Sequence, residues 1–227
     1  MIPPWVRVAV LVSGGGTNLQ ALLDAFGPPP PAPPLPPPLI TVARVVASRA
    51  GLGALERARC GGVPAVTLRD PADPVALLAA LEEIDLVVLA GYLKLVPAPV
   101  VARFLRRMIN IHPALLPAFG GPGMYGRRVH EAVLASGVTV TGATVHYVDE
   151  QYDRGPIIAQ WPVPVRPDDT PDTLAARVVA VEHQLLPAVV RELARRGLPA
   201  EPVRLCAEGA GFGSAGEAAV RITQATE

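Results

Sequence analysis

Residues 6–23 read Val-Arg-Val-Ala-Val-Leu-Val-Ser-Gly-Gly-Gly-Thr-Asn-Leu-Gln-Ala-Leu-Leu. The first seven residues have the continuous apolar pattern of a buried strand, and residues 17–23 have the apolar spacing of a helix. A buried strand that passes through glycines directly into a helix is typical of α/β proteins with a parallel sheet. The backbone amides and the positive end of the helix meet at this turn, so it favours an anionic ligand.

The kind of anion follows from the glycine spacing. The turn is not a Walker A motif, because no Gly-Lys-Ser/Thr follows it. It is not a full dinucleotide fingerprint either, since Gly14 and Gly16 are present but Leu19 stands where the third glycine would be. A single phosphate therefore suits this turn better than a pyrophosphate. The structural alternative is a tight strand–helix turn in which Thr17 or Asn18 caps the helix.

Strand and helix patterns alternate along the rest of the chain. This order predicts an α/β fold, an open and mostly parallel twisted sheet with helices on both faces and antiparallel strands toward the C-terminal half. We expect one domain over residues 1–227, with its ligand at the carboxyl ends of the strands. The predicted strands are 6–12, 39–47, 64–68, 85–90, 107–112, 139–148 and 156–165, and the predicted helices are 17–26, 51–60, 74–83, 97–105, 127–136 and 171–196.

Asn110 and His112 lie at the end of the fifth predicted strand, directly before Pro113. Residues i and i+2 of a strand point to the same face, so both side chains converge on one place. An amide donor beside an imidazole is what acyl transfer requires, because one can bind an oxyanion and the other can move a proton. The alternative is a strand end with a capping Asn and a hydrogen-bonded core His.

A second polar segment, residues 149–154, joins the two strands expected at 139–148 and 156–165. A carboxylate in this loop could reach His112, raise its pKa and fix its tautomer. The alternative is a solvated acidic turn. His146 lies in the preceding strand, and its pattern fits a structural role as well as a catalytic one.

Composition limits the classes of function. The 227 residues have a net charge of zero and a pI near 6.9, which gives no electrostatic footprint for nucleic acid. Two widely spaced cysteines argue for a reducing compartment, and no apolar run reaches membrane-spanning length.

Residues 28–38 contain nine prolines, so we expect a stiff connection there and, as the alternative, a ligand for proline-recognition domains. In the tail, 199–227, we expect one short strand near 203–206 and a loosely packed end.

Six motifs, taken together, resemble the folate-dependent phosphoribosylglycinamide formyltransferases of purine synthesis. Each motif alone is weak, but all occur in the family's order and at comparable spacing between residues 6 and 198. They are Ser-Gly-Gly-Gly-Thr-Asn-Leu-Gln (13–20), Leu-Ala-Gly-Tyr-Leu-Lys (89–94), Asn-Ile-His-Pro-Ala-Leu-Leu-Pro (110–117), Gly-Val-Thr-Val-Thr-Gly-Ala-Thr-Val-His (137–146), Asp-Arg-Gly-Pro-Ile-Ile (153–158) and Glu-His (182–183).

The resemblance implies transfer of a formyl group from 10-formyltetrahydrofolate, as co-substrate, to the amine of 5'-phosphoribosylglycinamide. In that reaction Asn110 would donate to the oxyanion of the tetrahedral adduct. His112 would stabilise the same oxyanion and carry a proton from the attacking amine to the leaving folate nitrogen. Asp153 matches the family's catalytic aspartate and would sustain the imidazolium form of His112. No metal is required for these steps.

The resemblance also implies substrate contacts. Gly16, Thr17 and Asn18 match the family's phosphate turn, and Glu182 matches the residue that binds the ribose hydroxyls. The pterin pocket would be closed on its other side by loop 148–153, and we expect residues 120–126 to form a mobile lid. Where the family often has a basic residue after the third strand, this chain reads Asp-Pro-Ala-Asp-Pro, which leaves Arg69 as the nearest candidate for the carboxylates of the folate tail. The residues that match the pterin-lining segment are Leu93, Lys94, Leu95 and Val96.

Two related enzyme classes share these motifs. Methionyl-tRNA formyltransferases carry a sizeable further C-terminal domain, and formyltetrahydrofolate deformylases carry an additional N-terminal domain. The deformylase, a hydrolase, is the main alternative, and a non-catalytic nucleotide-binding module is a second one. We expect a cytoplasmic enzyme of small-molecule substrates, monomer or homodimer, without nucleic-acid or membrane partners.

Overall fold

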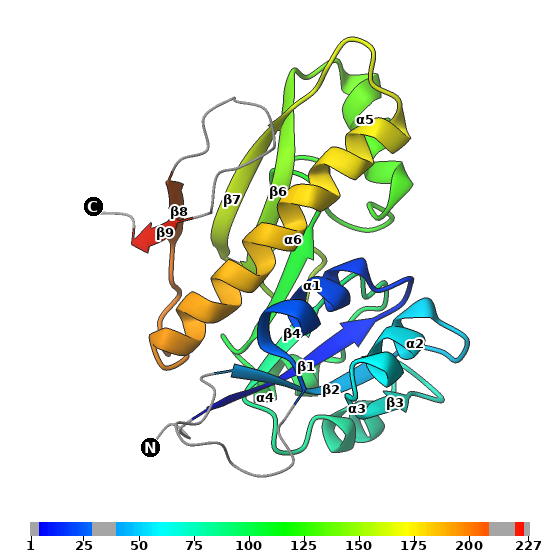
Figure 1. Ribbon diagram of the computed structural model, residues 1–227, viewed down its shortest axis with the longest axis vertical. Coiled ribbons are helices and arrows are strands. Elements are labelled where there is room, and N and C mark those ends of the chain that lie inside the picture. The colour runs from blue at the N-terminus through cyan, green and yellow to red at the C-terminus, as the bar shows by residue number, and fades with distance from the viewer. Residues whose placement is uncertain (1–4, 29–39, 209–220, 225–227) are drawn as a thin grey trace.

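The computed structural model describes residues 5–28, 40–208 and 221–224, and its main sheet has seven strands (Figure 1). The strand order is β3-β2-β1-β4-β5-β6-β7, in which β1 to β5 run parallel and β6 and β7 are antiparallel to their neighbours. The predicted fold class is therefore confirmed. The strands are β1 Val6–Val12, β2 Ile40–Ala47, β3 Ala65–Thr67, β4 Leu86–Leu89, β5 Met108–His112, β6 Val140–Tyr147 and β7 Ile157–Pro164.

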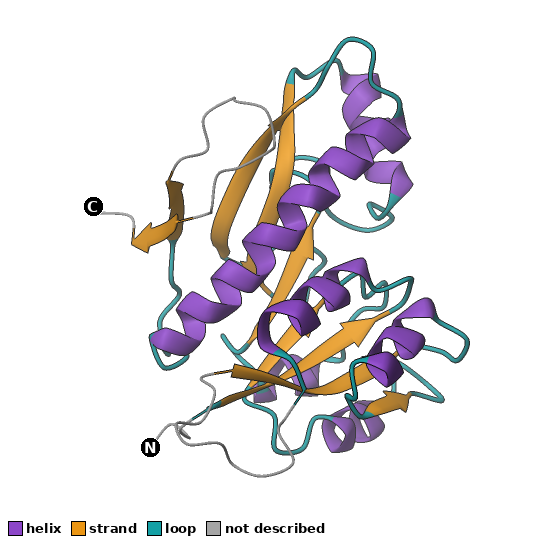
Figure 2. Ribbon diagram, viewed as in Figure 1, coloured by secondary structure: helices purple, strands orange, loops and turns teal. Residues whose placement is uncertain are grey.

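Helices cover both faces of the sheet (Figure 2). One face packs against α1, α2, α5 and α6, and the other packs against α3 and α4. Each face has its own apolar cluster, because the strands of the parallel part are buried on both sides. The helices are α1 Thr17–Phe26, α2 Gly53–Cys60, α3 Pro74–Ala80, α4 Ala98–Arg103, α5 Arg127–Ser136 and α6 Pro171–Arg195.

Several boundaries differ from the sequence prediction. Helix α1 is capped by Gly16 in the left-handed region, with φ of 78°, so neither Thr17 nor Asn18 caps it. Helix α3 ends at Ala80, three residues before the predicted end, and Glu83 then turns with a positive φ of 60°. Strand β3 has only three residues, all of them exposed, because it is the edge of the sheet.

The C-terminal part contains one strand more than predicted. Strand β8 (Leu205–Glu208) pairs in antiparallel fashion with β9 (Arg221–Gln224) in a separate two-stranded sheet. The single strand expected near 203–206 is thus displaced by two residues, and β9 was missed. The prediction for the proline-rich tract 28–38 lies outside the described residues except for Pro28.

Helix α6 is long and apolar enough, by length and composition, to cross a membrane. Its residues Val178, Leu185 and Val189 are fully buried against the sheet, and half of the most apolar part of the helix is buried inside the protein. This burial is typical of the core helix of a globular fold.

Candidate active site

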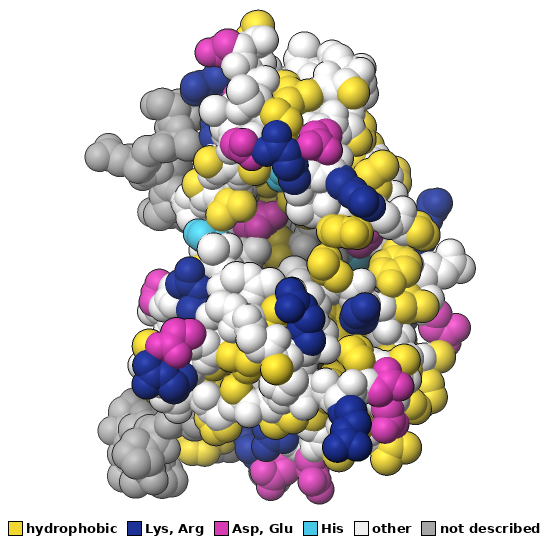
Figure 3. All heavy atoms as spheres, turned by 90° about the vertical axis from the view of Figure 1, so that its right-hand side faces the viewer, with side chains coloured by type: hydrophobic (Ala, Val, Ile, Leu, Met, Phe, Trp, Pro, Cys, Tyr) yellow, Lys and Arg dark blue, Asp and Glu magenta, His cyan; other side chains and the backbone are white. Residues whose placement is uncertain are grey.

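A cavity of about 500 Å³ opens at the carboxyl ends of the parallel strands. It is the hollow between the two halves of the face shown in Figure 3. Residues from α1, β5, segment 121–127, the loop after β6 and α6 line it, among them Asn18, Asn110, His112, Asp153 and Glu182. A ligand site at this edge is where an open parallel sheet predicts one. The structure therefore brings these five sequence-predicted site residues, together with Leu93, to one cavity.

Asn110 and His112 reach this cavity from β5. The strand is parallel to β4 and antiparallel to β6, and its register places Asn110 opposite His146 and His112 opposite Thr144. The two side chains share one face of the strand, as their spacing predicts. His112 is 3% exposed, so its hydrogen bonds and charge depend on protein groups more than on solvent.

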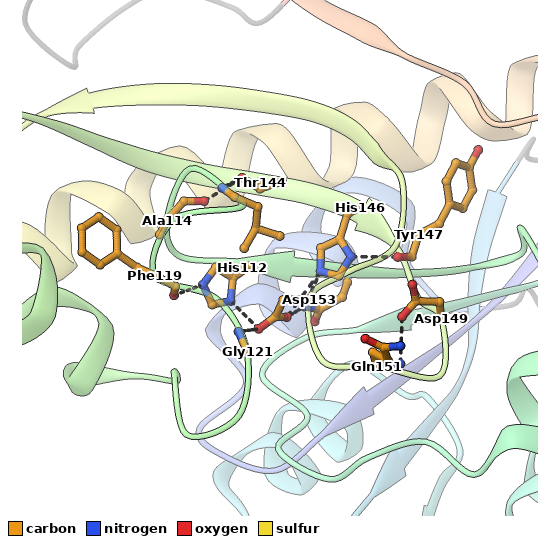
Figure 4. A network of polar contacts seen from close by, with 12 residues as sticks. His112, Ala114, Phe119, Gly121, Thr144, His146, Tyr147, Asp149, Gln151 and Asp153 are labelled. Carbon is orange, nitrogen blue, oxygen red and sulfur yellow. Dashed lines mark hydrogen bonds and ion pairs between the residues drawn. The ribbon is translucent and has the colours of Figure 1, made fainter.

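Asp153 lies between the two histidines (Figure 4). Its carboxylate oxygens are 3.6 Å from Nδ1 of His112 and 3.6 Å from Nε2 of His146. The backbone N–H of Gly121 donates to Oδ2 at 2.8 Å, and the amide of Asn110 is 3.5 Å from Oδ1. Asp153 itself has a positive φ of 57°, an uncommon conformation for a residue other than glycine. Sharp turns of this kind concentrate at functional sites.

His146 orients the amide of Asn110. Its Nδ1 is 2.8 Å from the carbonyl oxygen of Tyr147, and a carbonyl only accepts, so Nδ1 carries the proton. In the neutral ring Nε2 is then an acceptor, and the Asn110 amide nitrogen donates to it at 3.0 Å. The second amide hydrogen of Asn110 stays on the side of Asp153. His146 therefore has a positioning role in this arrangement.

The pKa of His112 is lowered, which corrects the expectation of a raised value. Burial is the largest cause, and it outweighs the charge of Asp153 and the carbonyl of Phe119, both of which raise the pKa. Burial alone would raise the pKa of Asp153, but contact with His146, the charge of His112 and the Gly121 amide together lower it. The free protein thus holds a neutral His112 beside a charged Asp153.

Glu182 lies at the α1 end of the cavity. Its carboxylate accepts a hydrogen bond of 2.7 Å from the Asn18 side chain, and the residue is 5% exposed. Burial raises its pKa to about 7, and the Asn18 hydrogen bond lowers it only partly. Oδ1 of Asn18 is buried without a hydrogen-bond partner within the described part of the chain. Asn18 and Glu182 therefore form a polar end of the cavity, where Oδ1 of Asn18 has no hydrogen-bond donor among the described residues.

The remaining predicted residues are distributed over other positions. Thr17 lines a separate groove with Arg57 and His183, and Gly16 caps α1 beside it. Leu93 lines the main cavity, whereas Lys94, Leu95 and Val96 line a small adjoining cavity of about 50 Å³. Asn110, Tyr152 and Asp153 line this small cavity as well.

Arg69 does not join the site. It is exposed after the edge strand β3 and is not among the residues that line either cavity. Asp149 accepts from the backbone N–H of Gln151 at 2.9 Å in an exposed turn, so Asp153 rather than Asp149 faces His112.

Tyr92 and His130 are two of the cavity residues that the sequence reasoning did not single out. Both line the main cavity and are 6% and 3% exposed, and each has a buried polar atom without a hydrogen-bond partner among the described residues. Tyr92 follows Gly91 within the recognised motif 89–94, so the sequence could have indicated it as a site residue. His130 gave no signal, because it stands at an apolar-spaced position of α5 between Val129 and Val133.

Comparison with known proteins identifies the family of this chain. The family model described as formyl transferase matches residues 6–190. A phosphoribosylglycinamide formyltransferase of Mycobacterium tuberculosis is 43% identical over 209 residues, which are 87% of this chain and 90% of that protein. A chloroplastic enzyme of the same name from Vigna unguiculata is 43% identical over 195 residues, 82% of this chain. The chain spans about 60% of the length of that plant relative.

A solved structure has the same fold. Glycinamide ribonucleotide transformylase 1 from Symbiobacterium toebii superposes with a TM-score of 0.72 at 40% identity, covering 92% of this chain and 93% of the other. The open sheet with an Asn, His and Asp cluster at its carboxyl edge thus defines a formyl transferase. Within this class, the chain belongs to the family of the phosphoribosylglycinamide formyltransferases.

Proposed function

We propose that the chain transfers the formyl group of 10-formyltetrahydrofolate to the amine of 5'-phosphoribosylglycinamide in purine biosynthesis. The observation that carries this proposal is the cluster of Asn110, His112 and Asp153 around one cavity, in a fold shared with enzymes of that name. The cluster joins an amide donor, a neutral imidazole and a carboxylate, which are the groups that acyl transfer to an amine requires.

The first step forms a bond between the substrate amine and the formyl carbon. The formyl oxygen becomes an oxyanion, and the Asn110 side-chain hydrogen on the side of Asp153 would donate to it in place of the carboxylate, 3.5 Å away. Loss of one such donor commonly costs about 2.7–4 kcal/mol in the barrier. Because burial keeps His112 neutral, its imidazole is ready to take the proton that the attacking amine releases.

The second step breaks the bond between the formyl carbon and the folate nitrogen. The oxyanion collapses to the new amide carbonyl, and the imidazolium of His112 gives its proton to the leaving nitrogen. The charge of Asp153, 3.6 Å from Nδ1, stabilises the imidazolium between the two steps. Because the leaving nitrogen is protonated directly, we propose that no metal takes part.

The two substrates would occupy opposite ends of the cavity. Glu182 and Asn18 are suited to the hydroxyl groups of the ribose, because both bury hydrogen-bonding atoms at one end. The glycine turn with Gly16 and Thr17 would bind the phosphate through backbone amides.

The folate would bind at the other end, against residues 93–96. Loop 148–153 lines the adjoining cavity of about 50 Å³ and would close the other side of the pterin pocket. Segment 120–126 would close over the substrates as a lid. We no longer assign the folate tail to Arg69, since it lies away from both cavities.

We further infer a cytoplasmic enzyme with one domain over residues 1–227, which acts as a monomer or homodimer on small molecules and not on nucleic acid or membranes. The neutral net charge and the two widely spaced cysteines support this setting.

Acceptor dependence tests the activity. Release of tetrahydrofolate should require phosphoribosylglycinamide in the wild-type protein, and it should nearly cease in a folded Asn110→Ala variant. Release that is equally fast without the acceptor would instead identify a deformylase.

A further inference from the structure

The backbone of residues 119–121 contacts two of the three clustered residues (Figure 4). The carbonyl oxygen of Phe119 is 2.8 Å from Nε2 of His112. Two residues later, the backbone N–H of Gly121 donates to Oδ2 of Asp153 at 2.8 Å. One short segment thus presents an acceptor to the imidazole and a donor to the carboxylate.

The conformation of this segment is unusual and tightly packed. Phe119 has a positive φ of 56°, which few residues other than Gly, Asn and Asp adopt, and Gly121 has φ of 98°. A Cβ atom on Gly120 would lie 2.5 Å from Cδ2 of Leu116 and 3.2 Å from Cβ of Asp153. The Phe119 side chain packs against the larger apolar cluster. Strain of this kind persists where the surroundings hold it in place, and it concentrates at functional sites.

We propose that residues 119–121 form a backbone clamp that sets the tautomer of His112, so that the neutral ring carries its proton on Nε2 and accepts a proton at Nδ1. A carbonyl oxygen cannot donate, so the nitrogen that it contacts must carry the hydrogen. The clamp leaves Nδ1 on the side of Asp153, where both residues line the cavity. Phe119 and Gly121 are therefore positioning residues, which act on the reaction through His112 and Asp153.

The polarity of the clamp matches the charges of the proposed reaction. The Phe119 carbonyl favours the imidazolium, and the Gly121 amide favours the carboxylate. The other titratable groups around His112 are Asp153, which also favours the imidazolium, and the neighbouring His146 and His130. The clamp thus supplies fixed dipoles directly beside the two side chains.

The consequence for turnover rests on the proposed formyl transfer, but the tautomer is a property of the free protein. The test compares Phe119→Val with Phe119→Asn, because both remove the aromatic ring while only Asn tolerates a positive φ. Ala118→Ser, at the exposed position before the clamp, is the control. The ¹⁵N NMR shifts of the His112 ring report the tautomer, and steady-state kinetics report kcat and KM.

In the wild type and in Ala118→Ser, the ring should show the Nε2–H tautomer. Phe119→Val should mix the tautomers, lower kcat by about tenfold or more and shift its pH profile, with KM little changed. Phe119→Asn should restore the tautomer and most of kcat. An unchanged tautomer in Phe119→Val would overturn the proposal. The proposal would also be overturned if Phe119→Val and Phe119→Asn lowered kcat equally, because the loss of the aromatic ring would then be the cause.

Gly120→Ala tests the clamp in case neither Phe119 variant folds. The added methyl displaces the segment from Asp153 without requiring a positive φ. It should disturb the His112 tautomer in the same way, and an unaltered ring spectrum would refute the clamp. If all tautomer results hold but no variant or wild type transfers a formyl group, the proposed function fails and the clamp stands.

Discussion

Glu182→Gln should stabilise the protein at high pH and leave its stability at low pH unchanged. Glutamine keeps an oxygen that accepts from Asn18 but cannot ionise. In the wild type, burial raises the pKa of Glu182 from its usual 4.5 to about 7. The folded protein therefore retains a proton that the unfolded chain has already lost between these two pH values. The contribution of Glu182 to the free energy of unfolding is therefore fully present below pH 4.5, and it is lost as the pH rises through about 7.

The size of the effect follows from the same two values. A difference between 4.5 and about 7, at about 1.4 kcal/mol per pH unit, gives about 3 kcal/mol of unfolding free energy. The wild type should lose roughly this amount between pH 4.5 and pH 8, and Glu182→Gln should not. This is an upper value, because local opening would let water reach the carboxylate.

Urea unfolding of both proteins at pH 5 and pH 8 measures the effect. The stability difference between variant and wild type should grow with pH, and the variant should bind phosphoribosylglycinamide more weakly at both values. A pH-independent difference would show that Glu182 ionises normally in the folded state. If the variant bound phosphoribosylglycinamide as tightly as the wild type, Glu182 would not contact the ribose. The raised pKa that follows from its burial would be unaffected by that result.

Three further outcomes are expected. Asn110→Ala should lower kcat by about 10²–10³-fold, and His112→Ala should also lower kcat strongly. Both variants should keep the circular dichroism spectrum of the native protein. A wild-type rate in either variant would show that its residue does not take part in catalysis. Asp153→Asn should lower the pKa of His112 further, and Asp149→Asn should leave that pKa unchanged. NMR titration of the His112 ring measures both effects. The reverse result would show that Asp149, not Asp153, is the carboxylate that acts on His112. Gly142→Ala should fail to give a stable fold in thermal unfolding, because its Cβ would overlap the Trp161 carbonyl across β6 and β7, and a wild-type melting temperature would contradict that register.

The strands of the main sheet were largely predictable from the sequence. Apolar runs are long and uninterrupted there, so β1 was predicted at its exact bounds and β5 within one residue. Helices α1 and α5 were also predicted at their observed bounds, whereas α3 ends three residues before its predicted end. Strand β9 was missed because the Gly- and Ala-rich tail has few large apolar residues that would indicate a strand.

The candidate site was predictable in its side chains but not in its backbone. Asn110 and His112 were recognisable from strand spacing, and Asp153 from its motif. No pattern could show that the Phe119 carbonyl and the Gly121 amide lie against them, because these contacts use atoms that every residue has. The direction of the His112 pKa was mispredicted for a similar reason, since its burial depends on the whole fold.

The fate of a labelled formyl group tests the central claim most directly. Wild-type protein is incubated with 10-formyltetrahydrofolate labelled in the formyl carbon, together with phosphoribosylglycinamide, and the products are separated. The account predicts that the label is found on the glycinamide nitrogen, in amounts equal to the tetrahydrofolate released, and that Asn110→Ala slows the transfer by about 10²–10³-fold. Label recovered as free formate, or retained on the folate, would contradict it.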